Sequence, residues 1–283
     1  MLDVLLEALL DTAKLIPFLF ITYLILEFIE HKAAEKTQAA AAKAGVFGPA
    51  VGGLLGVVPQ CGFSASAANL YAGGVISAGT LIAIFLSTSD EMLPVMLSEQ
   101  APVTRILTIL AVKAACGIVI GFAVDLVLRL CRKTPRKDSI SKLCHDEHCH
   151  CEKGIWVSSL IHTGQIALFI FVFSLLVGSI IYFIGEEQIA ALASRVGVLG
   201  PVVCGLIGLI PNCASSVVLT ELFLDGVIST GSMLAGLLAG SGVGLLILFR
   251  IHKNLKENLI IAAVIYLSGL AVGISFDLAG ITL

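Results

Sequence analysis

Two short tripeptides, each with a proline and a cysteine, interrupt otherwise apolar parts of the chain. They are Pro59-Gln60-Cys61 and Pro211-Asn212-Cys213. A pair of cysteines supplies soft thiolate ligands for a metal ion, and the amides of Gln60 and Asn212 add neutral oxygen donors. Proline has no amide hydrogen, so we expect the carbonyls of Leu55 and Ile207 to be available as further ligands. The alternative is that each cysteine packs as a small hydrophobic side chain.

Hydroxyl and carboxyl groups form a second candidate site inside the next apolar stretch. They lie in Ser87-Thr88-Ser89-Asp90-Glu91. Acidic side chains within a membrane are costly and usually face a cavity or an ion path. Pro94 removes the hydrogen bond to the carbonyl of Asp90, so this residue can offer both a carboxylate and a backbone oxygen to a hard cation. Hydration of Asp90 and Glu91 near an outer mouth is the alternative.

Other charged residues lie in or near the apolar stretches. Lys113 is expected either to be an internal counter-charge for the acids of segment 87–91 or to pair locally or snorkel toward the membrane surface. Asp125 and Arg129, four residues apart on a predicted helix, are expected to form a surface ion pair. Asp277 is a single acid in the last apolar stretch, and its sequence context assigns it no role.

A run of nine potential metal ligands, residues 144–152, lies between the two halves of the chain. Its spacing fits no closed zinc-finger pattern, but such a run can chelate a transition metal when the loop reorders. A solvated linker is the alternative. The predicted metal ligands of this loop are Cys144, His145, His148, Cys149, His150 and Cys151.

The composition indicates that these candidate ligands belong to a membrane protein. Of 283 residues, 58% are hydrophobic and 13% are charged, which is far more apolar than a soluble domain. We therefore expect a lipid bilayer and a metal or metalloid ion as partners, with no cofactor other than the transported ion and a metal at the loop. The net charge of -3 leaves no basic surface for nucleic acid.

Eight apolar stretches approach or exceed the ~20 residues that a membrane-spanning helix needs. They cover residues 2–29, 46–72, 75–97, 103–130, 163–184, 198–224, 227–249 and 259–283. The first stretch begins with acids rather than Lys or Arg, so we expect a retained helix and not a signal peptide. The two Pro–Cys tripeptides divide 46–72 and 198–224 into arms of roughly 20 Å, too short to cross the core. The remaining stretches are predicted to be continuous helices.

The two divided stretches are copies of each other at an offset of 152 residues. Between Gly48 and Asp90, 18 of 43 residues are identical to the residue 152 positions later. Glu221 takes the position of Asn69, so the polar groups differ between the copies. We predict two transmembrane repeats, 1–130 and 156–283, joined by a Cys/His-rich linker, 131–155. Repeats of this kind are typical of transporters with the substrate site between them.

Lys and Arg gather in three loops, 31–45, 131–155 and 250–256, which the positive-inside rule places in the cytoplasm. All three loops can be cytoplasmic only if each divided stretch enters and leaves the membrane on the same side, as a re-entrant or doubly spanning hairpin. Both termini are then extracytoplasmic and the repeats are inverted. The predicted fold is an all-α polytopic membrane protein whose hairpin tips meet around a midplane cavity. The predicted ion-binding residues are Gln60, Cys61, Asn69, Ser87, Asp90, Glu91, Asn212, Cys213 and Glu221.

Several motifs together resemble a family of ten-span heavy-metal exporters. They are Pro59-Gln60-Cys61-Gly62-Phe63-Ser64, Ala68-Asn69-Leu70-Tyr71-Ala72-Gly73, Ser87-Thr88-Ser89-Asp90-Glu91, Pro211-Asn212-Cys213-Ala214-Ser215-Ser216 and Ala239-Gly240-Ser241-Gly242-Val243-Gly244. Members of this family are labelled arsenic-efflux proteins or manganese transporters. The resemblance covers essentially the whole chain and implies efflux of a metal or metalloid.

Together these features predict a proton-coupled secondary exporter rather than an enzyme. Buried carboxylates can exchange a cation for protons. Manganese or another divalent metal is favoured, because adjacent carboxylates have no role in binding neutral arsenous acid. The alternatives are an arsenite or organoarsenical permease, a passive channel, and an intramembrane lipid-pyrophosphate phosphatase with serines at the tips. The phosphatase would need cationic partners near those serines, and the arginines lie at helix ends.

Overall fold

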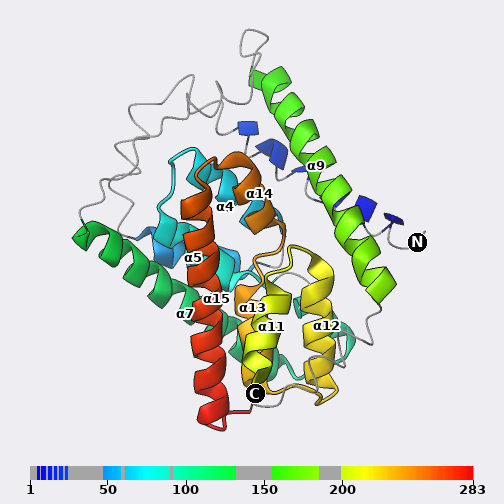
Figure 1. Ribbon diagram of the computed structural model, residues 1–283, viewed down its shortest axis with the longest axis vertical. Coiled ribbons are helices and arrows are strands. Elements are labelled where there is room, and N and C mark those ends of the chain that lie inside the picture. The colour runs from blue at the N-terminus through cyan, green and yellow to red at the C-terminus, as the bar shows by residue number, and fades with distance from the viewer. Residues whose placement is uncertain are drawn as a thin grey trace.

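The computed structural model in Figure 1 describes six parts of the chain. They are residues 5–24 without 7, 11, 15, 18 and 22, and residues 47–58, 61–89, 92–131, 155–184 and 199–282. Every regular element within these parts is a helix. Four helical stretches are long and apolar enough to cross a membrane: Ala78–Ser98, Val103–Leu130, Thr230–Ile251 and Leu255–Leu278. The chain is therefore an all-helical, multi-pass membrane protein, as the composition predicts.

The helices of the two halves have matching bounds. The first half contains α3 (Gly48–Gly56), α4 (Cys61–Ala72), α5 (Ala78–Ser87), α6 (Met92–Ser98) and α7 (Val103–Leu130). The second half contains α9 (Ile155–Ile184), α11 (Gly200–Gly208), α12 (Cys213–Leu224), α13 (Thr230–Ala239), α14 (Val243–Ile251) and α15 (Leu255–Leu278). Adding 152 to the bounds of α3, α4 and α5 gives those of α11, α12 and α13. The offset seen in the sequence is thus also an offset between helices.

Each half has two helix breaks where the sequence predicts one. The breaks between α3 and α4 and between α11 and α12 occur at the Pro–Cys tripeptides, as predicted. The prediction of continuous helices over 75–97 and 227–249 is wrong, because α5 and α13 end at Ser87 and Ala239. Thr88 leaves the helix with a ψ of 127°. In the second half Gly242 has a φ of 53°, a conformation that glycine adopts without strain.

Three helices of each half pack closely through glycines. In the first half, α3 and α7 pack on α5, and the backbones of Gly79 and Gly121 approach so closely that a Cβ on either would meet the other's carbonyl oxygen. In the second half, α11 and α15 pack on α13, with the same approach between Gly231 and Gly273. Gly231 and Gly273 lie 152 residues after Gly79 and Gly121, so the two three-helix units are built in the same way.

The remaining short helices cross between the halves. Helix α4 of the first half packs against α14 of the second, and α12 of the second half packs against α6 of the first. Because α4 corresponds to α12 and α6 to α14, this is the reciprocal exchange that a two-fold relation produces. Figure 1 shows α4 and α14 together toward one end of the molecule and α12 toward the other. Two hydrophobic clusters fill these regions, one around α4 and α14 and one around α6 and α12.

A peripheral layer covers the α4–α14 side. Residues 5–24 are helical where described, and they lie near α9, with the rings of Phe20 and Trp156 6.1 Å apart. Leu19 from this segment and Ile166 from α9 are both buried in the cluster around α4 and α14. Helix α9 begins at Ile155, eight residues before the predicted start at 163. Figure 1 shows it as a long rod along the edge of the molecule.

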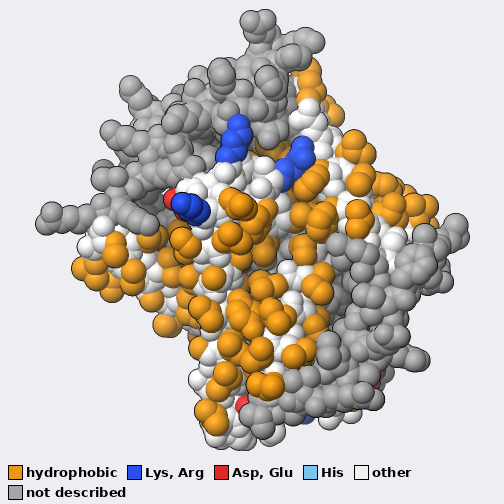
Figure 2. Space-filling view, viewed as in Figure 1, with side chains coloured by type: hydrophobic (Ala, Val, Ile, Leu, Met, Phe, Trp, Pro, Cys, Tyr) orange, Lys and Arg blue, Asp and Glu red, His pale blue; other side chains and the backbone are white. Residues whose placement is uncertain are grey.

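The surface is mainly apolar and has one basic end. Figure 2 shows hydrophobic side chains over most of the visible described surface, with Lys and Arg gathered near the upper end. Arg250, Lys253 and Lys256 are exposed at the turn between α14 and α15. The guanidinium of Arg250 lies 4.4 Å from the centre of the Phe169 ring on α9. This is the pattern of a helical bundle immersed in lipid with a charged turn at an interface.

Candidate functional site

Buried polar side chains gather where the helix breaks lie close together. We call the following residues the break centre: Ser64, Ser87, Thr88, Ser89, Lys113 and Ser241. Each of them is at most 2% exposed. They come from α4, from the end of α5, from α7 and from the α13–α14 connection. Polar groups at this depth need partners, and the contacts described next supply many of them.

Ser87, Thr88 and Ser89, at the end of α5, donate hydrogen bonds to backbone carbonyls. The hydroxyl of Ser87 donates to the carbonyl oxygen of Ala83 at 2.7 Å, and that of Thr88 donates to Ile84 at 2.7 Å. Ser89 donates to the carbonyl oxygen of Val57, 2.8 Å away, at the end of α3. The Ile84 carbonyl also accepts the amide of Thr88 at 3.0 Å, so the hydroxyls of Ser87 and Thr88 bond to carbonyls inside α5, whereas Ser89 bonds to a carbonyl at the end of α3, which has no helical partner four residues later. Ser89 also ties the α5–α6 break to the α3–α4 break.

The second half reaches the same place through the first turn of α14. A Cβ on Gly244 would lie 2.7 Å from Cβ of Ser64 and 2.8 Å from Cε1 of Phe85. Ser64 is in the first turn of α4, and Phe85 is in the last turn of α5. Three of the four breaks, those before α4, after α5 and before α14, are therefore adjacent. No side chain larger than hydrogen fits at residue 244 without displacing one of these neighbours.

Lys113 is the charged member of the break centre. Its side chain is 1% exposed, and Nζ donates to the carbonyl oxygen of Leu237 at 2.6 Å. The bond joins α7 of the first half to the last turn of α13 in the second half. The expectation that Lys113 snorkels to the surface is wrong, because this buried bond holds its ammonium in the interior.

The predicted carbonyl ligands at the tips already accept hydrogen bonds. The amide of Val58 donates to the carbonyl of Leu55 at 3.2 Å, and that of Ile210 donates to Ile207 at 3.1 Å. The expectation that proline leaves these oxygens free is therefore wrong. The chain tightens into a turn with bonds between residues three apart, which satisfies the carbonyls without the proline nitrogen.

The structure describes only some of the ligands predicted at the two hairpin tips and elsewhere. Cys61 and Cys213 are the first residues of α4 and α12, while their side chains lie outside the described residues. Asn212 is half-buried, and its backbone carbonyl accepts a bond of 2.8 Å from the hydroxyl of Ser215. The remaining predicted ligands outside the described residues are Gln60, Asp90 and Glu91, and in the linker Cys144, His145, His148, Cys149, His150 and Cys151.

Asn69 and Glu221, at equivalent positions of the repeats, have different surroundings. Asn69 is fully buried; its Oδ1 accepts from the hydroxyl of Tyr23 at 2.9 Å and its Nδ2 donates to Ala65 at 3.0 Å. These contacts join α4 to the N-terminal helical segment. Glu221 is exposed on α12. The structure gives Asn69 an anchoring role and does not bring Glu221 into the break centre.

Two aspartates that the sequence leaves aside hold equivalent helix starts. Asp125 accepts from the amide of Gly79 at 2.9 Å and from the hydroxyl of Ser77 at 2.7 Å. Asp277 accepts from the amide of Gly231 at 3.0 Å and from Ser229 at 2.9 Å. Ser77 and Ser229 in turn cap α5 and α13. The expectation of a surface role for Asp125 is wrong, since its side chain is buried. The two acids lie 152 residues apart, and this offset in the sequence could have predicted that they have equivalent roles.

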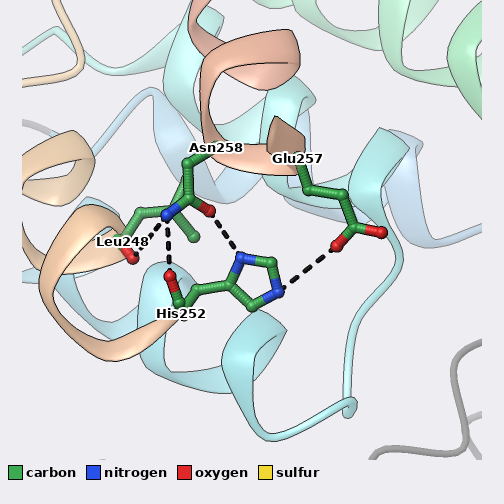
Figure 3. Close-up of polar contacts among 4 residues, drawn as sticks. All are labelled: Leu248, His252, Glu257 and Asn258. Atoms are coloured by element: carbon green, nitrogen blue, oxygen red, sulfur yellow. Dashed lines mark hydrogen bonds and ion pairs between the residues drawn. The ribbon is translucent and has the colours of Figure 1, made fainter. Parts of the chain in front are cut away.

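A second polar cluster fixes the turn between α14 and α15 (Figure 3). Nδ1 of His252 lies 2.5 Å from Oδ1 of Asn258, and its Nε2 lies 3.3 Å from Oε2 of Glu257. The amide nitrogen of Asn258 donates to the carbonyls of His252 and Leu248, so its Oδ1 is the acceptor and His252 Nδ1 carries a hydrogen. Figure 3 shows these groups closing one compact turn.

No group of three or more His, Cys, Asp or Glu side chains within the described residues is placed to hold a metal ion. Cys204 is buried and Cys116 half-buried, and both are free thiols. In the break centre, the described donors and acceptors are hydroxyls, backbone carbonyls and one ammonium. Oxygen groups of this kind suit a hard cation better than a soft one.

A family described as "Putative, 10TM heavy-metal exporter" matches residues 1–185, which include the first three-helix unit, the linker and α9. No curated protein and no solved structure matches the chain. The match covers about two thirds of the 283 residues.

Proposed function

Because the chain belongs to the family of 10TM heavy-metal exporters, we propose that it expels a divalent metal cation, manganese or a similar hard ion, in exchange for protons. The transport pathway passes through the break centre, between two repeats inverted in the membrane. The linker with Cys144 and His145 chelates a transition metal on the cytoplasmic side. Both termini are extracytoplasmic in this arrangement.

The observation that carries this proposal is the gathering of helix breaks and buried hydroxyls inside an otherwise apolar bundle. Broken helices present unpaired backbone groups to a substrate, and membrane transporters use them for ion coordination. Ser87, Thr88 and Ser89 are buried there, and Asp90 and Glu91 follow them directly in the sequence. Carboxylate, hydroxyl and carbonyl oxygens form the ligand set that a hard divalent cation prefers.

The cysteines have a secondary role in the proposal. Cys61 and Cys213, with Gln60 and Asn212, suit a softer ion or a trivalent arsenical. They lie in the first turns of α4 and α12 or just before them, and these helices pack against different partners. We therefore assign the selectivity for a hard cation to Asp90 and Glu91 and treat arsenite efflux as the competing outcome of the test.

The test measures Mn²⁺ and arsenite uptake into proteoliposomes with an imposed pH gradient. Asp90→Asn should abolish Mn²⁺ uptake, because a neutral amide cannot balance the charge of a dehydrated divalent ion. The double variant Cys61→Ser, Cys213→Ser should keep it. Asp225→Asn is the matched control, since Asp225 is an exposed acid after α12 and should leave uptake unchanged.

The other outcomes each select a different function. Arsenite uptake that depends on the cysteines and not on Asp90 identifies an arsenical permease. Uptake that is independent of the pH gradient identifies a passive channel. Normal Mn²⁺ uptake in all variants removes these residues from the pathway and contradicts the proposed site.

A further inference from the structure

The position of Lys113 is set by the packing of α7 on α5. Gly121 of α7 lies against Gly79, and one turn earlier Gly117 lies against Ala83 and Ser87. The two helices therefore run antiparallel, and each turn of α7 advances about one turn along α5. Lys113 is the next residue in this series, so it lies at the level of Ser87, the last residue of α5, where the α5–α6 break begins.

The ammonium of Lys113 bonds to a carbonyl at the end of a helix. Helix α13 stops at Ala239, so the carbonyl of Leu237 cannot receive the usual amide bond from a helical residue four positions later. The C-terminal end of a helix also carries partial negative charge. The Nζ to oxygen distance of 2.6 Å places the ammonium where it neutralises this end. A metal cation would seek the same oxygen.

Only one half of the molecule carries this charge. The residue 152 positions after Lys113 is Ile265, which is fully buried in α15. The residue of the first half that corresponds to Leu237 is Phe85, which packs beside Ser64 and Gly244. The break centre therefore holds a built-in cation from the first half and none at the equivalent position of the second.

From this geometry we infer that Lys113 is a tethered cation that competes with the transported metal for the oxygens of the break centre. The ammonium occupies the end of α13 when the site is empty, and metal binding displaces it. Return of the ammonium to the Leu237 carbonyl helps to expel the metal. This role rests on the proposed function, because it requires that a metal cation enters the break centre.

Mn²⁺ binding to the purified full-length protein tests the inference, with free Mn²⁺ followed by its electron paramagnetic resonance signal. Lys113→Met removes the competing charge, so Mn²⁺ should bind at least tenfold more tightly than to the wild type. Transport in proteoliposomes should slow at the same time, because the bound metal is no longer displaced. Lys113→Arg keeps the charge and should bind Mn²⁺ as weakly as the wild type. Ile265→Met, at the equivalent position, should change neither property.

Unchanged or weaker Mn²⁺ binding by folded Lys113→Met overturns the inference. A second measurement uses the wild type alone and covers a failure of the variant to fold. Saturation with Mn²⁺ should increase reductive methylation of Lys113 several-fold, measured by mass spectrometry against exposed Lys253. Equal or reduced methylation also overturns it. If the wild type neither binds nor transports Mn²⁺ or another divalent cation, the proposed function itself fails. This outcome is measured on the wild type alone and is therefore distinct from failure of the inference about Lys113.

Discussion

Asp125 and Asp277 make the same contacts in very different surroundings. Each carboxylate accepts a backbone amide and a serine hydroxyl at the start of the central helix of its three-helix unit. Asp125 is 7% exposed, whereas Asp277 is exposed. Water competes for a hydrogen bond at an exposed carboxylate and cannot replace one at a buried carboxylate. Equal geometry should therefore give unequal stabilisation.

Alanine substitution of the two aspartates measures this difference. Asp125→Ala should lower the free energy of unfolding by about 2–4 kcal/mol, because it leaves the buried amide of Gly79 and the half-buried hydroxyl of Ser77 without their charged acceptor. Asp277→Ala should cost about 1 kcal/mol. Thermal unfolding of the purified variants in detergent gives both values, with Asp225→Ala as an exposed control. Equal losses for the two variants would mean that burial does not decide the strength of the bonds.

The sequence predicts the helix breaks that a proline causes, but not the breaks and side-chain positions that tertiary packing determines. Proline at residues 59 and 211 cannot continue a hydrogen-bonded helix, so two breaks were predictable. Thr88 carries no comparable signal, and its departure from the helix depends on contacts such as the Ser89 bond to Val57. The surroundings of Lys113 depend on how α7 packs on α5 and on where the last turn of α13 lies, and neither the periodicity nor the repeat offset predicts these positions.

The packing of α4 against α14 depends on the absence of a side chain at Gly244. Gly244→Ala should impair folding and transport, because the new Cβ would lie 2.7 Å from Cβ of Ser64 and 2.9 Å from its backbone carbon. Such crowding in a packed core costs roughly 1–3 kcal/mol or more. Gly164→Ala on α9 is the matched control, since nothing lies within 4 Å of its added Cβ. Yield of monodisperse protein and its unfolding temperature measure the effect. Equal behaviour of the two variants would show that α14 can move away from α4 freely.

For the whole molecule, the exchanged helices make the two halves interdependent. Helix α4 packs largely against α14, and α12 packs partly against α6, so neither half encloses its core alone.

Such an exchange between copies follows a two-fold relation, but a two-fold axis can lie in the membrane plane or along its normal. The first case gives inverted repeats and the second gives parallel ones. Charge favours the first. The positive-inside rule predicts a cytoplasmic α14–α15 turn from Arg250, Lys253 and Lys256, whereas the equivalent α6–α7 turn has Glu99.

The sidedness of these two equivalent turns separates inverted from parallel repeats. We expect Lys253→Cys to react with a membrane-impermeant maleimide only after cells are permeabilised, and Glu99→Cys to react in intact cells. Both positions are exposed, and each variant is made in a chain whose eight native cysteines are replaced. Permeabilised cells, in which both cysteines must react, provide the control for access. Labelling of both turns from the same side would make the repeats parallel, and the break centre could not then alternate between two sides by exchanging the roles of equivalent halves.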